Sequence, residues 1–216
     1  MGSRRAQEDT FKSDTEGVDV RERLPVFGES RRERADAARN RRRILEAAER
    51  LVAERGVEGL LMNDVAEAAG VGVGTLYRRF GDRAGLAYAL LDERTREFQE
   101  AFLQGPPPLG PGAPPVERLR AFLFAYVDEL ETHGELNLMA ETASPGARYR
   151  SGGYRAYRAH VSALIHEARP DADAEYLAEA LLAPLAADVY VRQRREQEMS
   201  TKRIKAGLDE IVRCLT

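Results

Sequence analysis

The chain has 216 residues, which is enough for one large domain or for a small domain followed by a medium one. Its hydrophobic content of 43% excludes a mostly disordered chain, and its formal net charge of −3 means that any surface for a polyanion must be local. A lone cysteine, Cys214, excludes an internal disulfide and a thiolate metal cluster. No apolar run is long enough to cross a membrane, and the first residues are polar where a signal peptide is apolar, so we expect a cytoplasmic protein.

Residues 1–38 mix charges of both signs with few apolar residues, and this composition predicts a disordered extension. A helical pattern begins near Asp36. It becomes clear from Ile44 to Val52, where apolar residues recur at i, i+3, i+4 and i+7, and Gly56 is expected to end this helix.

Two short helices are expected next, over residues 63–69 and 73–80, separated by a turn at Gly70-Val71-Gly72. Asp82 is well placed to cap the helix that follows, whose apolar residues continue in register to Phe102.

Residues 105–115 are rich in proline and glycine and predict a loop. Helices are then expected over residues 116–133, 136–143, 154–168, 172–197 with a kink at Pro184, and 201–215. Since no strand pattern occurs, the sequence predicts an all-α protein of about nine helices. A helix-turn-helix domain of three helices is expected over 39–85, and a larger helical domain over 86–216.

Two short helices joined by a tight glycine-containing turn, with a third helix before them, are typical of DNA-binding helix-turn-helix domains. The turn must be tight so that the second helix projects and fits a major groove about 12 Å wide. The outer face of that helix then holds Val73, Gly74, Thr75, Tyr77 and Arg78. A glycine inside a helix costs roughly 0.5–1 kcal/mol relative to alanine, and close approach to a phosphate would explain it.

A family resemblance rests on the stretch AEAAGVGVGTLYRRF at residues 66–80, followed by Asp82, Arg83 and Leu86. It resembles the signature of the TetR family of bacterial repressors. The resemblance implies a repressor that binds a palindromic operator as a homodimer and is released by a small-molecule ligand. In such a protein the ligand is expected to move the fourth helix, and with it the separation of the two recognition helices.

The resemblance also implies individual roles. Thr75 and Tyr77 are expected to contact phosphates or base edges, Val73 to offer apolar contact to a thymine methyl, and Arg83 to hold a phosphate. Leu61 departs from the family pattern, because a Ser or Thr usually caps the second helix there; Asn63 is the candidate substitute.

Arginines cluster at residues 39–43, immediately before the first apolar turn. Arginines that neutralise phosphates release counterions and give salt-dependent affinity, and in the family such an arm reaches the minor groove. The alternative is a solvated helix end. The predicted DNA-contacting residues are Arg39, Arg41, Arg42, Asn63, Val73, Gly74, Thr75, Tyr77, Arg78 and Arg83.

Aromatic residues on the middle helices are candidates for an apolar pocket with a few hydroxyls, which would take a small apolar or amphipathic ligand. The alternative is that they are ordinary core residues. The candidate ligand-binding residues are Phe98, Phe102, Phe122, Tyr126, Met139, Tyr154, Tyr157 and Tyr190.

The last two long helices carry apolar faces that are expected to form a four-helix bundle with a second copy. The alternative is that these faces pack inside one chain. The candidate dimer residues are Leu177, Leu181, Leu185, Leu208, Ile211 and Leu215.

The sequence shows no motif for a nucleophile, a cofactor loop or a metal site, so we expect no enzyme, no cofactor and no metal. The histidines lack metal-ligand spacing. Two alternatives to a ligand-released repressor stay open: a DNA-binding protein without a small-molecule effector, either an orphan or architectural, and an activator.

Overall fold

The structure is a computed structural model, and it describes residues 29–214 of the chain. This part is all-α, as predicted, and contains ten α-helices, two short 3₁₀ helices and no strand. The helices are α1 (Glu29–Arg55), η1 (Val57–Gly59), α2 (Met62–Ala69), α3 (Val73–Phe80), α4 (Arg83–Gln104), α5 (Pro115–Glu141), α6 (Ala147–Arg150), α7 (Gly152–Ala168), α8 (Ala174–Leu182), η2 (Ala183–Leu185), α9 (Ala187–Arg195) and α10 (Thr201–Cys214).

The chain divides into two units, residues 1–39 and residues 40–216. The described part of the first unit is the beginning of α1, where Arg39 pairs with Asp36. Residues 29–38 were expected to be disordered but are helical, because alanine and arginine, which recur there, are strong helix formers. The remainder of the predicted extension, residues 1–28, lies outside the described residues.

In the second unit, one apolar core joins the end of α1, the helices α2 and α3, the first half of α4 and the end of α5. Ile44, Val65, Leu76 and Leu86 are fully buried in it. Asp82 caps α4 as predicted, since its side chain accepts a hydrogen bond of 2.8 Å from Gly85 N. These contacts fix the direction in which α3 projects.

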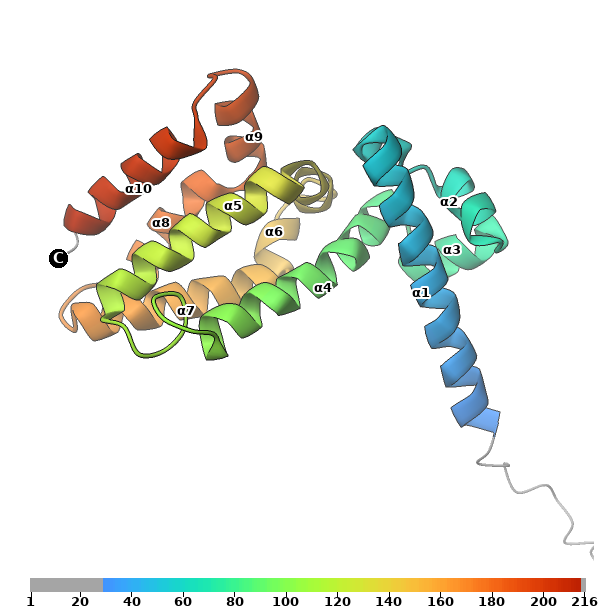
Figure 1. Ribbon diagram of the computed structural model, residues 1–216, viewed down its shortest axis with the longest axis horizontal. Coiled ribbons are helices and arrows are strands. Elements are labelled where there is room, and N and C mark those ends of the chain that lie inside the picture. The colour runs from blue at the N-terminus through green and yellow to red at the C-terminus, as the bar shows by residue number, and fades with distance from the viewer. Residues whose placement is uncertain (1–28, 215–216) are drawn as a thin grey trace, which may run out of the picture. The chain divides into compact units, whose positions relative to one another are not determined.

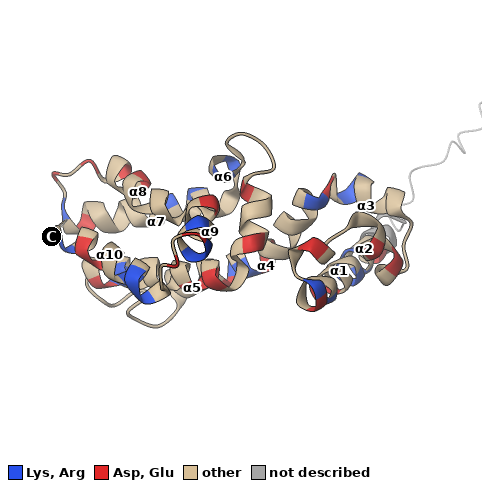
Figure 2. Ribbon diagram, turned by 90° about the horizontal axis from the view of Figure 1, so that it is seen from above, with Lys and Arg blue, Asp and Glu red and all other residues tan. Residues whose placement is uncertain are grey.

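A second core joins the end of α4 with α5, α7, α8, η2, α9 and α10. Here α5 is the central helix, and α4, α7, α9 and α10 all pack on it (Figure 1). Basic and acidic residues are interspersed over these helices (Figure 2).

The helix count differs from the expected one at three places. The helix predicted over 172–197 is interrupted, because Pro184 lacks an N–H and cannot continue the helix of α8. The two helices predicted over 116–143 form one, α5, with a kink at His133, where φ is −124°. The short helix α6 lies in a segment whose prolines and glycines predict a loop.

Candidate functional site

The turn between α2 and α3 is held by its backbone and by an arginine. Gly70 has φ 61° and ψ 41°, the left-handed conformation that glycine favours, and it ends α2. Arg43 Nη2 donates to the carbonyl of Ala69 at 2.6 Å, so this arginine satisfies a free carbonyl at the end of α2. Arg43 therefore serves the fold of this turn.

The outer face of α3 carries a set of side chains that the core leaves to solvent. Leu76 is fully buried, whereas Val73 is 39% and Tyr77 51% exposed. Gly74 and Arg78 are also exposed, and Thr75 is half-buried. A Cβ built on Gly74 would meet no protein atom within 4 Å, so packing within the chain gives no reason for a glycine there.

Among the other predicted DNA-contacting residues, some side chains contact their own chain and others are exposed. Arg83 Nη2 donates to the carbonyl of Val57, which ties the start of α4 to η1, so this arginine has an intramolecular role beside the predicted phosphate contact. Arg41 turns toward α4, where its guanidinium lies 3.9 Å from Asp92. Arg42 is exposed.

At the start of α2, Leu61 occupies the N-cap position and makes no side-chain cap bond, as its chemistry requires. Its side chain is 48% exposed. Asn63 is exposed in the first turn of the same helix and makes no cap bond either.

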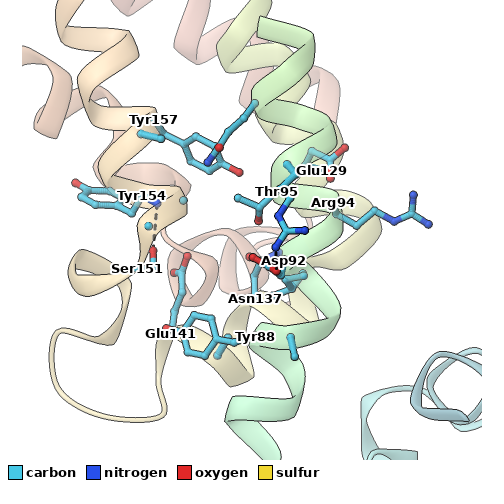
Figure 3. Close-up of a pocket in the computed structure, with 18 of the residues that line it drawn as sticks. Tyr88, Asp92, Arg94, Thr95, Glu129, Asn137, Glu141, Ser151, Tyr154 and Tyr157 are labelled. Atoms are coloured by element: carbon cyan, nitrogen blue, oxygen red, sulfur yellow. Dashed lines mark hydrogen bonds and ion pairs between the residues drawn. The ribbon is translucent and has the colours of Figure 1, made fainter. Parts of the chain in front are cut away.

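A cavity of about 760 Å³ lies among α4, α5 and α7 and reaches Arg41 of α1 and the end of α3. Figure 3 shows how three helices contribute polar and aromatic side chains to it. Those labelled there are Tyr88, Asp92, Arg94 and Thr95 from α4, Glu129, Asn137 and Glu141 from α5, Ser151 at the start of α7, and Tyr154 and Tyr157 from α7. Its size suits a drug-sized small molecule.

Three of the eight predicted pocket residues line this cavity: Tyr126, Tyr154 and Tyr157. Burial raises the pKa of Tyr126 to about 12 and also raises that of Tyr157, because both phenols are shielded from water.

The other predicted aromatics belong to the core, which corrects that part of the prediction. Phe98, Phe102 and Phe122 pack ring against ring, with centroids 5.2–5.4 Å apart, because burying rings against one another removes more apolar surface from water than lining a cavity does. Met139 packs against the first core. Tyr190 is buried beside a separate groove, where its hydroxyl donates to Glu131 at 2.7 Å.

The sequence-based reading missed the polar residues of the cavity. Tyr88, Asp92 and Thr95 are spaced three and four residues apart on α4, and Asn137 and Glu141 four apart on α5, so each set shares one helix face. That spacing was visible in the sequence, but exposed polar faces show it too.

The predicted dimer residues divide in a similar way. Leu181, Leu185 and Leu208 are at most 3% exposed and belong to the chain's own core, so these three cannot meet a second copy. Leu177 is partly buried against the same core, and Leu215 lies outside the described residues. Ile211 is 45% exposed on α10.

Residues 29–214 contain no group of three or more histidine, cysteine, aspartate or glutamate side chains arranged to hold a metal ion. Within the same residues, no helix combines the length and the apolar character needed to cross a membrane.

Comparisons with known proteins give one match to a family model and several to curated relatives, each over a part of the chain. A family model described as bacterial regulatory proteins, tetR family, matches residues 44–90. An HTH-type transcriptional regulator of Staphylococcus aureus strain bovine RF122 / ET3-1 is 42% identical over 71 residues, and one of strain USA300 is 44% identical over the same length. Each match covers 33% of this chain and only 38% of the relative.

Solved structures match most of the chain. A putative TetR-family transcriptional regulator from Rhodococcus sp. is 25% identical with a TM-score of 0.57, covering 82% of this chain and 98% of its own. A putative regulator from Saccharomonospora viridis in complex with choline is 21% identical (TM-score 0.58; 82% and 96% covered). The regulator FadR from Bacillus subtilis in complex with stearoyl-CoA is 16% identical (TM-score 0.56; 79% and 96% covered).

Proposed function

We propose that the chain is a repressor of the TetR family of bacterial transcriptional regulators and that it binds a palindromic operator as a homodimer. We further propose that a small molecule in the cavity among α4, α5 and α7 releases it from DNA.

The proposal of DNA binding is supported by the exposed side chains on the outer face of α3. Val73 and Tyr77 are large side chains left to solvent on a helix whose other side is fixed by the buried Leu76. A helix held this way projects its outer residues as one rigid surface, as entry into a major groove requires. The open space at Gly74 would let a phosphate approach the helix N-terminus closely.

A homodimer follows from palindromic recognition, because each half-site needs one recognition helix. The outward faces of α8 and α10 support this pairing. Tyr176 on α8 is 70% exposed and Ile211 on α10 is 45% exposed, and small residues such as Gly207 lie between the exposed groups of α10. These faces replace the buried leucines as the proposed contact.

Ligand control is supported by the position of the cavity. Its lining includes Tyr88, Asp92 and Thr95 of α4 together with Arg79 and Phe80 at the end of α3. A molecule bound there would touch both the recognition helix and the helix that joins it to the second core. Since the lining is aromatic and polar, the ligand is expected to carry hydrogen-bonding groups as well as apolar surface.

The DNA-binding proposal is tested by mixing the full chain with fragmented genomic DNA from its source and sequencing the bound fragments. Discrete palindromes are expected, whereas broad coverage would favour an architectural protein. On a bound palindrome, Tyr77→Ala and Thr75→Ala should each weaken binding about tenfold or more, as the loss of one good contact predicts. Tyr149→Ala is the matched control, because Tyr149 is 60% exposed on α6. Binding by both α3 variants at the parent's affinity would refute the assignment of α3.

A further inference from the structure

A single arginine is buried in the second core at the place where α8 ends. Arg148 on α6 is only 5% exposed, and it is the charged residue that the described chain buries most. Its Nη1 donates to both carboxylate oxygens of Glu141, at 2.9 and 3.0 Å, and to the carbonyl of Leu185 at 3.0 Å. Its Nη2 donates to the carbonyl of Leu182, also at 3.0 Å. The guanidinium thus satisfies two carbonyls that the helix break leaves without partners.

Glu141 holds the other side of the same break. Its Oε2 accepts a hydrogen bond of 2.9 Å from the N–H of Ala187, the first residue of α9. A carboxylate at this position satisfies a free N–H and is itself stabilised by the positive end of the α9 dipole. The pair Arg148–Glu141 therefore joins the end of α8, the segment η2 and the start of α9.

The same carboxylate lines the cavity. Glu141 is 14% exposed and lies among the cavity side chains beside Tyr88 (Figure 3). Burial, and after it the charge of Glu141, raises the pKa of Tyr88.

Asn137, one turn earlier on α5, also lines the cavity and adds a second acceptor. Its Nδ2 donates to the carbonyl of His133 at 3.0 Å, which leaves its carbonyl oxygen for other partners. This part of the wall offers two acceptors on one helix face, which suits a ligand group that donates hydrogen bonds.

We propose that Glu141 links the cavity to the interruption at η2 between α8 and α9, here called the break. It does so by binding a protonated amine of the ligand, which changes how firmly the break is held. This role of Glu141 rests on the proposed release of the chain from DNA by a ligand. An ammonium group that donates hydrogen bonds to the Glu141 carboxylate competes for its oxygens with Arg148 and with the Ala187 N–H. The break then loosens, and α8, which carries part of the proposed dimer face, is no longer held in one position relative to α5.

The test measures hydrogen exchange of the full chain by mass spectrometry, without DNA. The probes are 2-phenylethylamine and 3-phenylpropanoate at millimolar concentration, which share an aromatic ring and a short chain but carry opposite charges. The amine should speed exchange several-fold in peptides that cover residues 183–190, and the acid should not. Equal effects of both probes, or no effect of the amine there, would overturn the proposal.

Two variants test whether the response to the amine depends on Glu141 or only on binding somewhere in the cavity. Glu141→Gln should abolish the response to the amine, while Glu117→Gln, which removes an exposed carboxylate of α5 outside the cavity lining, should keep it. A response that survives Glu141→Gln, or one lost in Glu117→Gln, would contradict the role of Glu141. The comparison of the two probes on the unmodified chain decides the matter if Glu141→Gln is unstable. Because no DNA is present, the outcome is independent of whether Tyr77→Ala impairs DNA binding.

Discussion

Replacing Arg148 by methionine removes four hydrogen bonds with little change in side-chain volume. The substitution leaves the Glu141 carboxylate, 14% exposed, without its counter-charge and leaves the carbonyls of Leu182 and Leu185 without donors. Breaking a buried ion pair by removing one partner costs about 3–5 kcal/mol, because the remaining charge stays desolvated. For a chain of 150–250 residues each kcal/mol lowers the melting temperature by about 2–4 °C. We therefore expect a fall of about 6–20 °C.

The assay is unfolding followed by circular dichroism, by heat for the melting temperature and by urea for the free energy of unfolding. Both are done at one fixed protein concentration, because dimerisation would shift the midpoints. Arg158→Met is the matched control. Its guanidinium lies 3.6 Å from Glu179 and 3.7 Å from Glu175 but is 36% exposed, so the loss should stay below about 1 kcal/mol. The double variant Arg148→Met/Glu141→Leu should regain at least about 1 kcal/mol over Arg148→Met alone, because no buried charge is left unpaired. Equal losses for Arg148→Met and Arg158→Met would refute the reasoning.

Three further predictions address other parts of the chain. Burial, and after it the charge of Arg118, lowers the pKa of His160 to about 4, whereas the pKa in an unfolded chain is about 6.5. Because the unfolded chain then binds a proton that the folded chain does not, stability should fall as the pH drops from about 6.5 to about 4. His160→Phe should flatten this pH dependence in thermal melts, whereas a slope that persists, or one that His166→Phe removes equally, would contradict the assignment. Ile211→Glu should shift sedimentation from dimer to monomer, and an unchanged dimer would place the contact elsewhere. Gly70→Ala puts a side chain at φ 61° and should lower stability by about 1–2 kcal/mol; a neutral result would mean that the turn tolerates another conformation.

The helix-turn-helix was predictable because its signals are local. The glycines at the turn, the cap at Asp82 and the spacing of Leu76 and Phe80 act within a few residues of one another, so the sequence alone determined two short helices, their junction and the side that would face outward. Both short helices lie where the sequence predicts them, to within one residue, although Arg83 binds the carbonyl of Val57.

The cavity was not predictable to the same degree because its walls come from three helices that are far apart in sequence. Large rings such as Phe98 and Phe122 were the natural candidates, yet they pack against each other because this removes most apolar surface from water. Polar residues such as Asn137 and Glu141 line the cavity because bonds to His133 and Arg148 satisfy part of their polar groups.

The sequence by itself determined the all-α class, the ends of the short helices beside Gly70 and Gly81, and the outward face of α3. All of these depend on neighbours within one or two turns. Only the tertiary structure decided which leucines are buried, which polar residues share the cavity, and that Arg148, one of many arginines in the sequence, is enclosed with Glu141. The physical reason is that burial and charge pairing depend on helices distant in the chain, which no local pattern records.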